Sequence, residues 1–205
     1  MNRERLNRDL RRRALLLAYA TVAWNVVEGV VSIGAGAAAG STALVGFGLD
    51  SFVESLSGGV MIWRFGQHDA HAAEAVERRA TRLVGWTLIV LAAYVLLDAA
   101  WSLYSGERPE RSVLGMAITL LSLVVMPVLF IAKRRTARAL ASRSMAADSR
   151  QTLACAWLSA GVLGGLLLNR YLGWWWADGV IALAIALWLF REGREALTEG
   201  KLCAC

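Results

Sequence analysis

Long apolar stretches alternate with shorter polar and charged links along the whole chain. Each stretch approaches the roughly 20 residues that an α-helix needs to cross the hydrocarbon core of a bilayer, which is about 30 Å thick. The stretches run over Ala14 to Ile33, Ser41 to Trp63, Leu83 to Tyr104, Ser112 to Ala132, Met145 to Asn169 and Trp174 to Phe190. The pattern therefore predicts an all-α membrane protein in which one domain, residues 1–205, contains six transmembrane helices.

The links between the apolar stretches are short, which indicates a compact bundle. Small or polar residues predict tight turns on one side of the membrane, over Gly34 to Gly40, Ser105 to Arg111 and Arg170 to Gly173. The links on the other side, Arg64 to Arg82 and Lys133 to Ser144, are longer, charged and rich in alanine. We expect these two links to continue as helical extensions of the neighbouring spans.

Composition supports a membrane location. Hydrophobic residues make up 57% of the 205 residues, which include nine tryptophans, and the mean hydropathy is +0.49. Soluble domains of this length are rarely so apolar. We therefore expect an integral, multi-pass protein, in contact with membrane lipid, in the plasma membrane.

The net charge of +6 is compatible with nucleic-acid binding, but the positions of the basic residues favour another explanation. Of the 22 Lys and Arg residues, 18 lie in the N-terminal segment, the second link, the fourth link that includes Lys133, or the C-terminal segment. Arg108, Arg111 and Arg170 lie in links on the opposite side. Cytoplasmic loops of membrane proteins carry such an excess of basic residues. Both termini are therefore predicted to be cytoplasmic, and nucleic acid is not an expected partner.

Two acidic residues, Asp50 and Glu54, lie one helical turn apart inside the second apolar stretch. A charge at bilayer depth costs roughly 3 kcal/mol or more, so an acid there usually meets a cation, a proton or a polar partner. Two such acids on one helical face indicate ion handling. The alternative is that they pair with neighbouring helices and serve packing alone.

Depth along the helices brings a second pair of polar residues to the same level. Asp50 lies about 14 Å from the start of the second span at 1.5 Å per residue, and Cys155 lies about 15 Å into the fifth span, which runs the other way. Antiparallel packing then places Asp50 level with Cys155, and Glu54 level with Gln151. Each pair has i,i+4 spacing and projects from one face of its helix. Two carboxylates, a thiol and an amide are thus predicted to converge.

These groups are chemically suited to a borderline-soft divalent cation. Zinc accepts thiolate and carboxylate, so Asp50, Glu54 and Cys155 are candidate ligands, with the Gln151 oxygen or water as the fourth. A buried thiol stays protonated, whereas a bound metal deprotonates it, so metal and protons would exchange at one site. The alternatives are that Cys155 is a small packing residue and that Gln151 makes an interhelical hydrogen bond. No resident cofactor is expected.

Further polar residues define a second layer. Asn25 lies near mid-depth, and three acids lie about 6 to 10 Å from the outer boundary by the same arithmetic. These acids are Glu28, Asp98 and Asp178. They either line an outward exit path or pair with the outer arginines, and we slightly favour the pairing. Asp148, at the cytoplasmic mouth of the fifth span, is either an acid that relays the incoming ion or a helix-start acid favoured by the dipole.

Three motifs carry a family resemblance. Gly48 to Gly58 (GLDSFVESLSG) resembles the second span of the cation diffusion facilitator (cation efflux) family, in which two acids lie four residues apart. Ala147 to Cys155 (ADSRQTLAC) resembles the fifth span of that family, and Trp176 to Ala182 (WADGVIA) resembles the sixth. The similarity covers roughly residues 14–195 in order and topology.

The resemblance implies a homodimeric transporter that moves divalent cations, commonly zinc, out of the cytoplasm in exchange for protons. Family members usually place His and Asp four residues apart on the fifth span, where this chain has Gln151 and Cys155. The chain ends soon after the sixth span, so the metal-sensing cytoplasmic domain typical of the family is not expected. Cys203 and Cys205, near the end of the chain, are either a soft-metal tail or a frayed terminus.

Other classes of function remain open. A membrane scaffold needs only the helices and their small-residue faces, and a cation channel would use the same acids. An enzyme that uses Cys155 as nucleophile needs an activating base, and the predicted spans contain no histidine. The sequence therefore favours transport by alternating access over catalysis.

Overall fold

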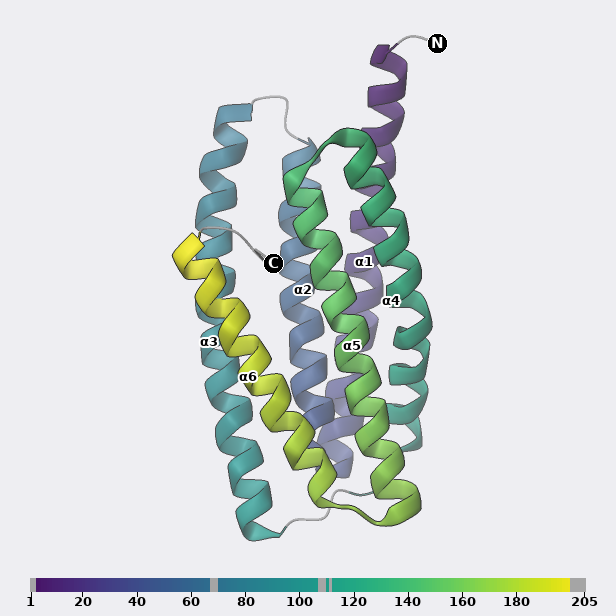
Figure 1. The fold of residues 1–205 in the computed structure, drawn as a ribbon, viewed down its shortest axis with the longest axis vertical. Coiled ribbons are helices and arrows are strands. Elements are labelled where there is room, and N and C mark those ends of the chain that lie inside the picture. Colours follow the sequence, from purple (N-terminus) through teal and green to yellow (C-terminus); the bar gives the residue numbers. More distant parts are fainter. Residues whose placement is uncertain (1–2, 67–69, 107–109, 111, 200–205) are drawn as a thin grey trace.

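The computed structural model describes residues 3–66, 70–106, 110 and 112–199. Over these residues the chain forms six helices that run alternately up and down the bundle (Figure 1). They are α1 (Arg3–Ala39), α2 (Thr42–Gly66), α3 (Ala70–Ser105), α4 (Val113–Leu140), α5 (Arg143–Leu172) and α6 (Trp176–Glu199). The predicted all-α architecture is confirmed.

Four segments are long and apolar enough to cross a membrane by length and composition, counted over the described residues. They are Arg8–Ala39, Leu88–Ser105, Val113–Leu140 and Asp148–Leu172. The acids Asp50 and Glu54 lower the hydropathy of α2, which is not among the four. The chain is an all-α membrane protein.

The central helix of the bundle is α2, which packs against α1, α3, α5 and α6. The most extensive packing joins α1 to α2, α3 to α6, and α4 to α5. In Figure 1, α3 and α6 form one side of the molecule, and α1, α2, α4 and α5 form the other. A group on the inward faces of α2 and α5 therefore lies deep inside the protein.

Two glycines allow α1 and α2 to approach closely. A Cβ added to Gly29 would lie 3.0 Å from the carbonyl oxygen of Gly48, and a Cβ on Gly48 would lie 2.9 Å from the carbonyl oxygen of Gly29. Small residues allow this in membranes, where lipid supplies no hydrophobic drive for helix association. The contact sets the register between the two helices.

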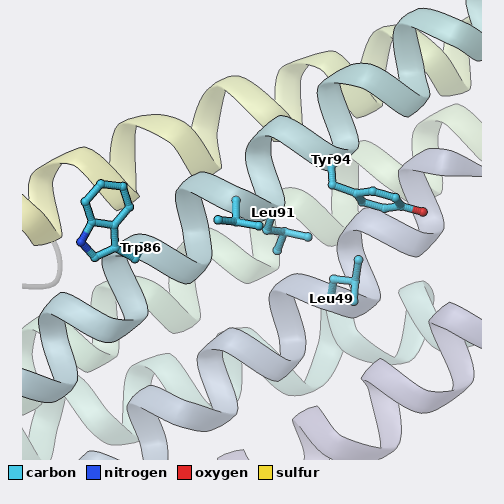
Figure 2. Close-up of a pocket in the computed structure, with 5 residues that line it drawn as sticks. Leu49, Trp86, Leu91 and Tyr94 are labelled. Carbon is cyan, nitrogen blue, oxygen red and sulfur yellow. The ribbon is translucent and has the colours of Figure 1, made fainter.

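The outer surface of the bundle is apolar. Exposed large side chains include Leu97, Trp101, Tyr104 and Trp157, each at least 63% exposed. A shallow apolar groove between α2 and α3 is lined by Leu49, Trp86, Val90, Leu91 and Tyr94, four of which are labelled in Figure 2. Apolar surface of this extent is unusual for a soluble monomer and suits contact with lipid.

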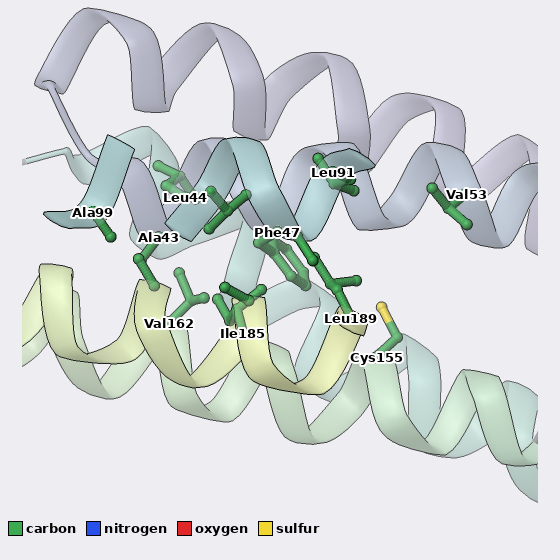
Figure 3. Close-up of a cluster of buried hydrophobic side chains, with 14 of the residues drawn as sticks. Ala43, Leu44, Phe47, Val53, Leu91, Ala99, Cys155, Val162, Ile185 and Leu189 are labelled. Carbon is green, nitrogen blue, oxygen red and sulfur yellow. The ribbon is translucent and has the colours of Figure 1, made fainter. Parts of the chain in front are cut away.

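The apolar core lies between α2, α3, α5 and α6. Leu44 and Phe47 from α2 pack there with Ile185 and Leu189 from α6. Figure 3 shows Cys155 toward one end of this cluster, with Val53 beyond it and with the Cys155 sulfur directed away from α5 into the space between the helices. Cys155 thus lies where the apolar core gives way to buried polar groups.

The turns differ in part from those expected. Residues 34–39 are helical, so the turn expected over Gly34 to Gly40 is confined to Gly40, with φ of +65°, and Ser41. The alanine-rich run before Gly40 explains this, because alanine is the best helix former. The predicted extension of α4 through the fourth link is present, and α5 follows after Ala141 and Ser142.

Candidate functional site

The two acids of α2 are buried inside the bundle. Asp50 is 6% exposed and Glu54 is 1% exposed. Asp50 lies within electrostatic range of the carboxyl groups of Glu192, Glu54 and Glu28. The second apolar stretch thus brings two acidic side chains into the protein interior.

The α5 side of the site meets α2 through Thr152. The Thr152 hydroxyl donates to Glu54 Oε1 at 2.8 Å. Gln151, which was predicted at the level of Glu54, is buried, and its Oε1 atom has no hydrogen-bond partner. The depth estimate was therefore accurate to one residue, and the rotation of α5 presents the threonine to Glu54.

Cys155 lies among three carboxyl groups. Its sulfur is 4.0 Å from Glu28 Oε2, and it interacts electrostatically with Glu54, Glu28 and Asp50. Cys155 therefore lies near Glu28 of α1 and within electrostatic range of the α2 acids with which it was predicted to converge.

Glu28 lies deeper than the depth arithmetic placed it. Its side chain is fully buried, and Ser51 of α2 donates to its Oε2 atom at 3.1 Å. The arithmetic ended the first span at Ile33, whereas α1 continues to Ala39. These six extra residues move the outer end by about 9 Å. Glu28 is therefore part of the interior site and does not belong to the outer group of acids in which it was predicted.

Lys133 is a member of the site that the sequence did not identify. It was counted among the basic residues of the fourth link, yet its side chain is fully buried. Its Nζ atom lies 2.8 Å from Asp148 Oδ2 and donates to Thr152 Oγ1 at 2.8 Å. The predicted extension of α4 carries Lys133 into the bundle, so only three-dimensional structure reveals its partners.

We call these residues the central cluster. Its members are Asn25, Glu28, Asp50, Glu54, Lys133, Asp148, Gln151, Thr152 and Cys155. All nine are buried, and they come from α1, α2, α4 and α5. Charged groups are rarely buried in such number unless they serve a purpose beyond packing.

Several atoms of the central cluster have no hydrogen-bond partner. They are both amide atoms of Asn25, Glu28 Oε1, Glu54 Oε2, Asp148 Oδ1 and Gln151 Oε1. A buried polar atom without a partner costs about 1–3 kcal/mol. Most of these atoms are oxygens, so a cation with its water is the kind of ligand that would satisfy them.

The central cluster is not a closed metal cage. Within the part of the chain that the structure describes, no three His, Cys, Asp or Glu side chains lie close enough together to hold a metal ion. The arrangement therefore gathers buried charged and polar groups from four helices without fixed coordination geometry.

A second acidic group lies at the start of α2, and we call it the cap cluster: Ser41, Thr42, Ala43, Asp98 and Asp178. Ser41 Oγ donates to Asp178 Oδ1, and the backbone N–H of Ala43 donates to Asp178 Oδ2 at 3.3 Å. Thr42 Oγ1 donates to Asp98 Oδ2 at 2.7 Å. Asp178 therefore satisfies a backbone N–H at the N-terminus of α2, and Asp98 accepts a side-chain hydroxyl at the same end, where negative charge is favoured by the helix dipole.

The expected pairing of the outer acids with arginines stays a prediction, because two of the three arginines are not among the described residues. Arg170 stacks over the ring of Tyr171, with 5.9 Å from its guanidinium carbon to the ring centroid. Arg108 and Arg111 lie outside the described residues, as do Cys203 and Cys205.

Most of the chain matches a known family. Residues 18–201 match the family model described as the cation efflux transmembrane domain. The cation-efflux pump FieF of Shewanella oneidensis is 30% identical over 139 residues, which cover 65% of this chain and 44% of FieF. The uncharacterized transporter sll1263 of Synechocystis is 26% identical over 177 residues, which cover 82% of this chain and 57% of that protein.

A vertebrate protein is also similar. Transmembrane protein 163 of Xenopus laevis is 21% identical over 197 residues, which cover 93% of this chain and 68% of that protein. The chain spans about half the length of FieF and of sll1263, at 44% and 57%. The matched residues include the whole central cluster, because it lies between Asn25 and Cys155.

Proposed function

This chain belongs to the cation efflux family, and we propose that it moves a divalent cation out of the cytoplasm in exchange for protons, with zinc as the expected ion. The observation that carries the proposal is the central cluster. Its carboxyl, amide and thiol groups are buried, and Glu28, Glu54, Asp148 and Gln151 each have an oxygen without a partner. A transported cation supplies the charge and the contacts that these atoms lack.

In this proposal Asp50, Glu54 and Cys155 bind the ion, and the Gln151 oxygen or water completes its coordination. The Cys155 thiol loses its proton as the sulfur binds the cation, and it regains a proton when the cation leaves. Each bound ion thus displaces at least one proton from the site. This exchange is the chemical basis of antiport.

The open geometry of the central cluster is consistent with a transported ion. A structural zinc site holds its metal with four fixed ligands, whereas a transporter has to release its ion. Binding would draw α2 and α5 together around the ion, and release would let them separate. The Thr152 to Glu54 hydrogen bond links the two helices at this level.

The remaining expectations belong to the same proposal. All six helices cross the membrane, and both termini are cytoplasmic, because the helix ends that carry most of the basic residues lie at one end of the bundle (Figure 1). The protein acts as a homodimer in the plasma membrane. It uses no resident cofactor and catalyses no covalent reaction.

Transport by purified protein in liposomes tests the proposal. Uptake of zinc, manganese, cadmium and iron(II) is measured with and without a proton gradient. We expect saturable uptake of at least zinc that depends on the gradient, and loss of uptake in Asp50→Asn. The matched control is Glu110→Gln, which removes an exposed acid and should leave uptake unchanged.

Other results would overturn the proposal. The absence of uptake for all four ions in the wild-type protein would favour a membrane scaffold. Uptake that does not saturate and does not respond to the proton gradient would favour a channel. Normal uptake in Asp50→Asn would remove the central cluster from the transport path.

A further inference from the structure

Lys133 places a positive charge inside a cluster that is proposed to bind cations. Its side chain is fully buried, although the next residues on α4, Arg134 and Arg135, are exposed. Arg134 lies over the Phe130 ring at 5.6 Å from the centroid. The rotation of α4 therefore brings one charge of this basic run into the bundle and leaves its neighbours outside.

The chemistry of lysine gives the hydrogen bonds around it a direction. An ammonium group only donates, so the Thr152 hydroxyl accepts from Lys133 Nζ at 2.8 Å. The one hydrogen of this hydroxyl has two acceptors in reach, and Glu54 Oε1 at 2.8 Å is nearer than the Asp148 carbonyl oxygen at 3.2 Å. A polarised chain thus runs from α4 through α5 to α2, and it leaves Glu54 Oε2 without a partner.

A plain buried ion pair with Asp148 would explain only part of this arrangement. Such pairs contribute little to stability compared with apolar residues of similar size. Lys133 is also linked to Glu54 through the Thr152 hydroxyl. The lysine is therefore coupled to a proposed ligand as well as to its own ion-pair partner.

We propose that Lys133 is a positioning residue whose fixed positive charge lowers the affinity of the cation site and so speeds release of the ion. It acts through Thr152, which holds one oxygen of Glu54 and leaves the other for the ion. A positive charge at this range opposes a second cation, because buried charges are weakly screened. The inference rests on the proposed function and assigns a regulator of affinity to the same site.

The test uses three variants that differ in charge and place. Lys133→Met removes the buried charge, Lys133→Arg keeps it, and Arg134→Met removes an exposed charge from the next position. For Lys133→Met we expect KM for zinc uptake to fall about tenfold, and Vmax to fall several-fold because release slows. Zinc Kd, measured by calorimetry, should fall in parallel. Lys133→Arg should lie near wild type in both parameters, and Arg134→Met should not differ from it.

A fourth variant keeps the test decisive if Lys133→Met fails to fold. Lys133→Gln removes the charge and keeps an amide that can donate to Asp148 and Thr152, the two partners of Lys133, so KM should still fall. An unchanged or raised KM in a folded charge-removing variant would overturn the inference. Wild-type protein without saturable zinc uptake would instead overturn the proposed function, so the two failures are distinguishable.

Discussion

The central cluster and the cap cluster both place buried acids against α2, but they differ in how the acids are satisfied. In the cap cluster, both oxygens of Asp178 accept hydrogen bonds, from Ser41 and from the Ala43 N–H. In the central cluster, Glu28, Glu54 and Asp148 each leave one carboxyl oxygen without a partner. Burial alone therefore does not identify a functional acid. Incomplete hydrogen bonding separates three acids of the central cluster, the proposed ligand Glu54 among them, from Asp178, which holds a helix end.

Neutralising one acid in each cluster is the strongest test of the difference between the two clusters. Asp50→Asn should reduce zinc uptake by up to about 100-fold, since a lost contact to a charged group is worth up to about 3 kcal/mol. Asp178→Asn should retain uptake per folded molecule, because its oxygens serve α2. Uptake assays on reconstituted protein, normalised to folded protein, provide the measurement. Equal losses in the two variants would remove the distinction between the clusters.

For the stability of the protein we expect the reverse order, with a larger loss from a change in the cap cluster than from a change in the central cluster. Asp178→Ala leaves the Ser41 hydroxyl and the Ala43 N–H without acceptors, so we expect the free energy of unfolding to fall by about 1–3 kcal/mol. Asp50→Asn should not lower stability, because it relieves repulsion among buried carboxyl groups. Unfolding of both variants in detergent, followed by circular dichroism, compares the two effects. A more stable Asp178→Ala protein would contradict the capping role.

Glu28 tests how far the central cluster extends beyond the predicted ligands. Its Oε2 atom is 4.0 Å from the Cys155 sulfur. Glu28→Gln removes negative charge from this position and should raise KM for zinc about tenfold, with a smaller change in Vmax. Concentration-dependent uptake checks this. An unaltered KM would limit the ion site to α2 and α5.

The smallest expected effect is at the edge of the cap cluster. Thr42→Val removes the hydroxyl that donates to Asp98 Oδ2 at 2.7 Å. We expect a loss of about 0.5–1.5 kcal/mol in stability and no change in KM. Chemical unfolding and uptake, measured on the same preparation, compare the two quantities. A shift in KM would show that the cap cluster is coupled to transport.

Much of the fold could be predicted from local patterns. The apolar stretches match the six helices, and the acidic pair Asp50 and Glu54 stood out because acids are rare inside such stretches. Depth arithmetic brought α5 to the correct level within one residue. The errors lie at helix ends, as for α1, where a continuation to Ala39 shifted the depth of Glu28.

Lys133 and Thr152 show where prediction from the sequence stops. Lys133 begins a basic run that resembles a cytoplasmic link, and Thr152 is an ordinary small residue in an apolar helix. Both become informative only when α4 and α5 pack side by side and orient them toward Glu54. The same holds for Asp98 and Asp178, whose partners belong to a different helix.

Local composition was enough to establish the helices, the apolar exterior and the presence of acids within an apolar stretch, because a helix satisfies its backbone hydrogen bonds within its own segment. The partner of each buried polar group depends instead on helix rotation and register, which come from contacts between distant segments. The close approach of Gly29 and Gly48 is one such contact. Tertiary packing therefore decided which acids are satisfied and which are left with free oxygens.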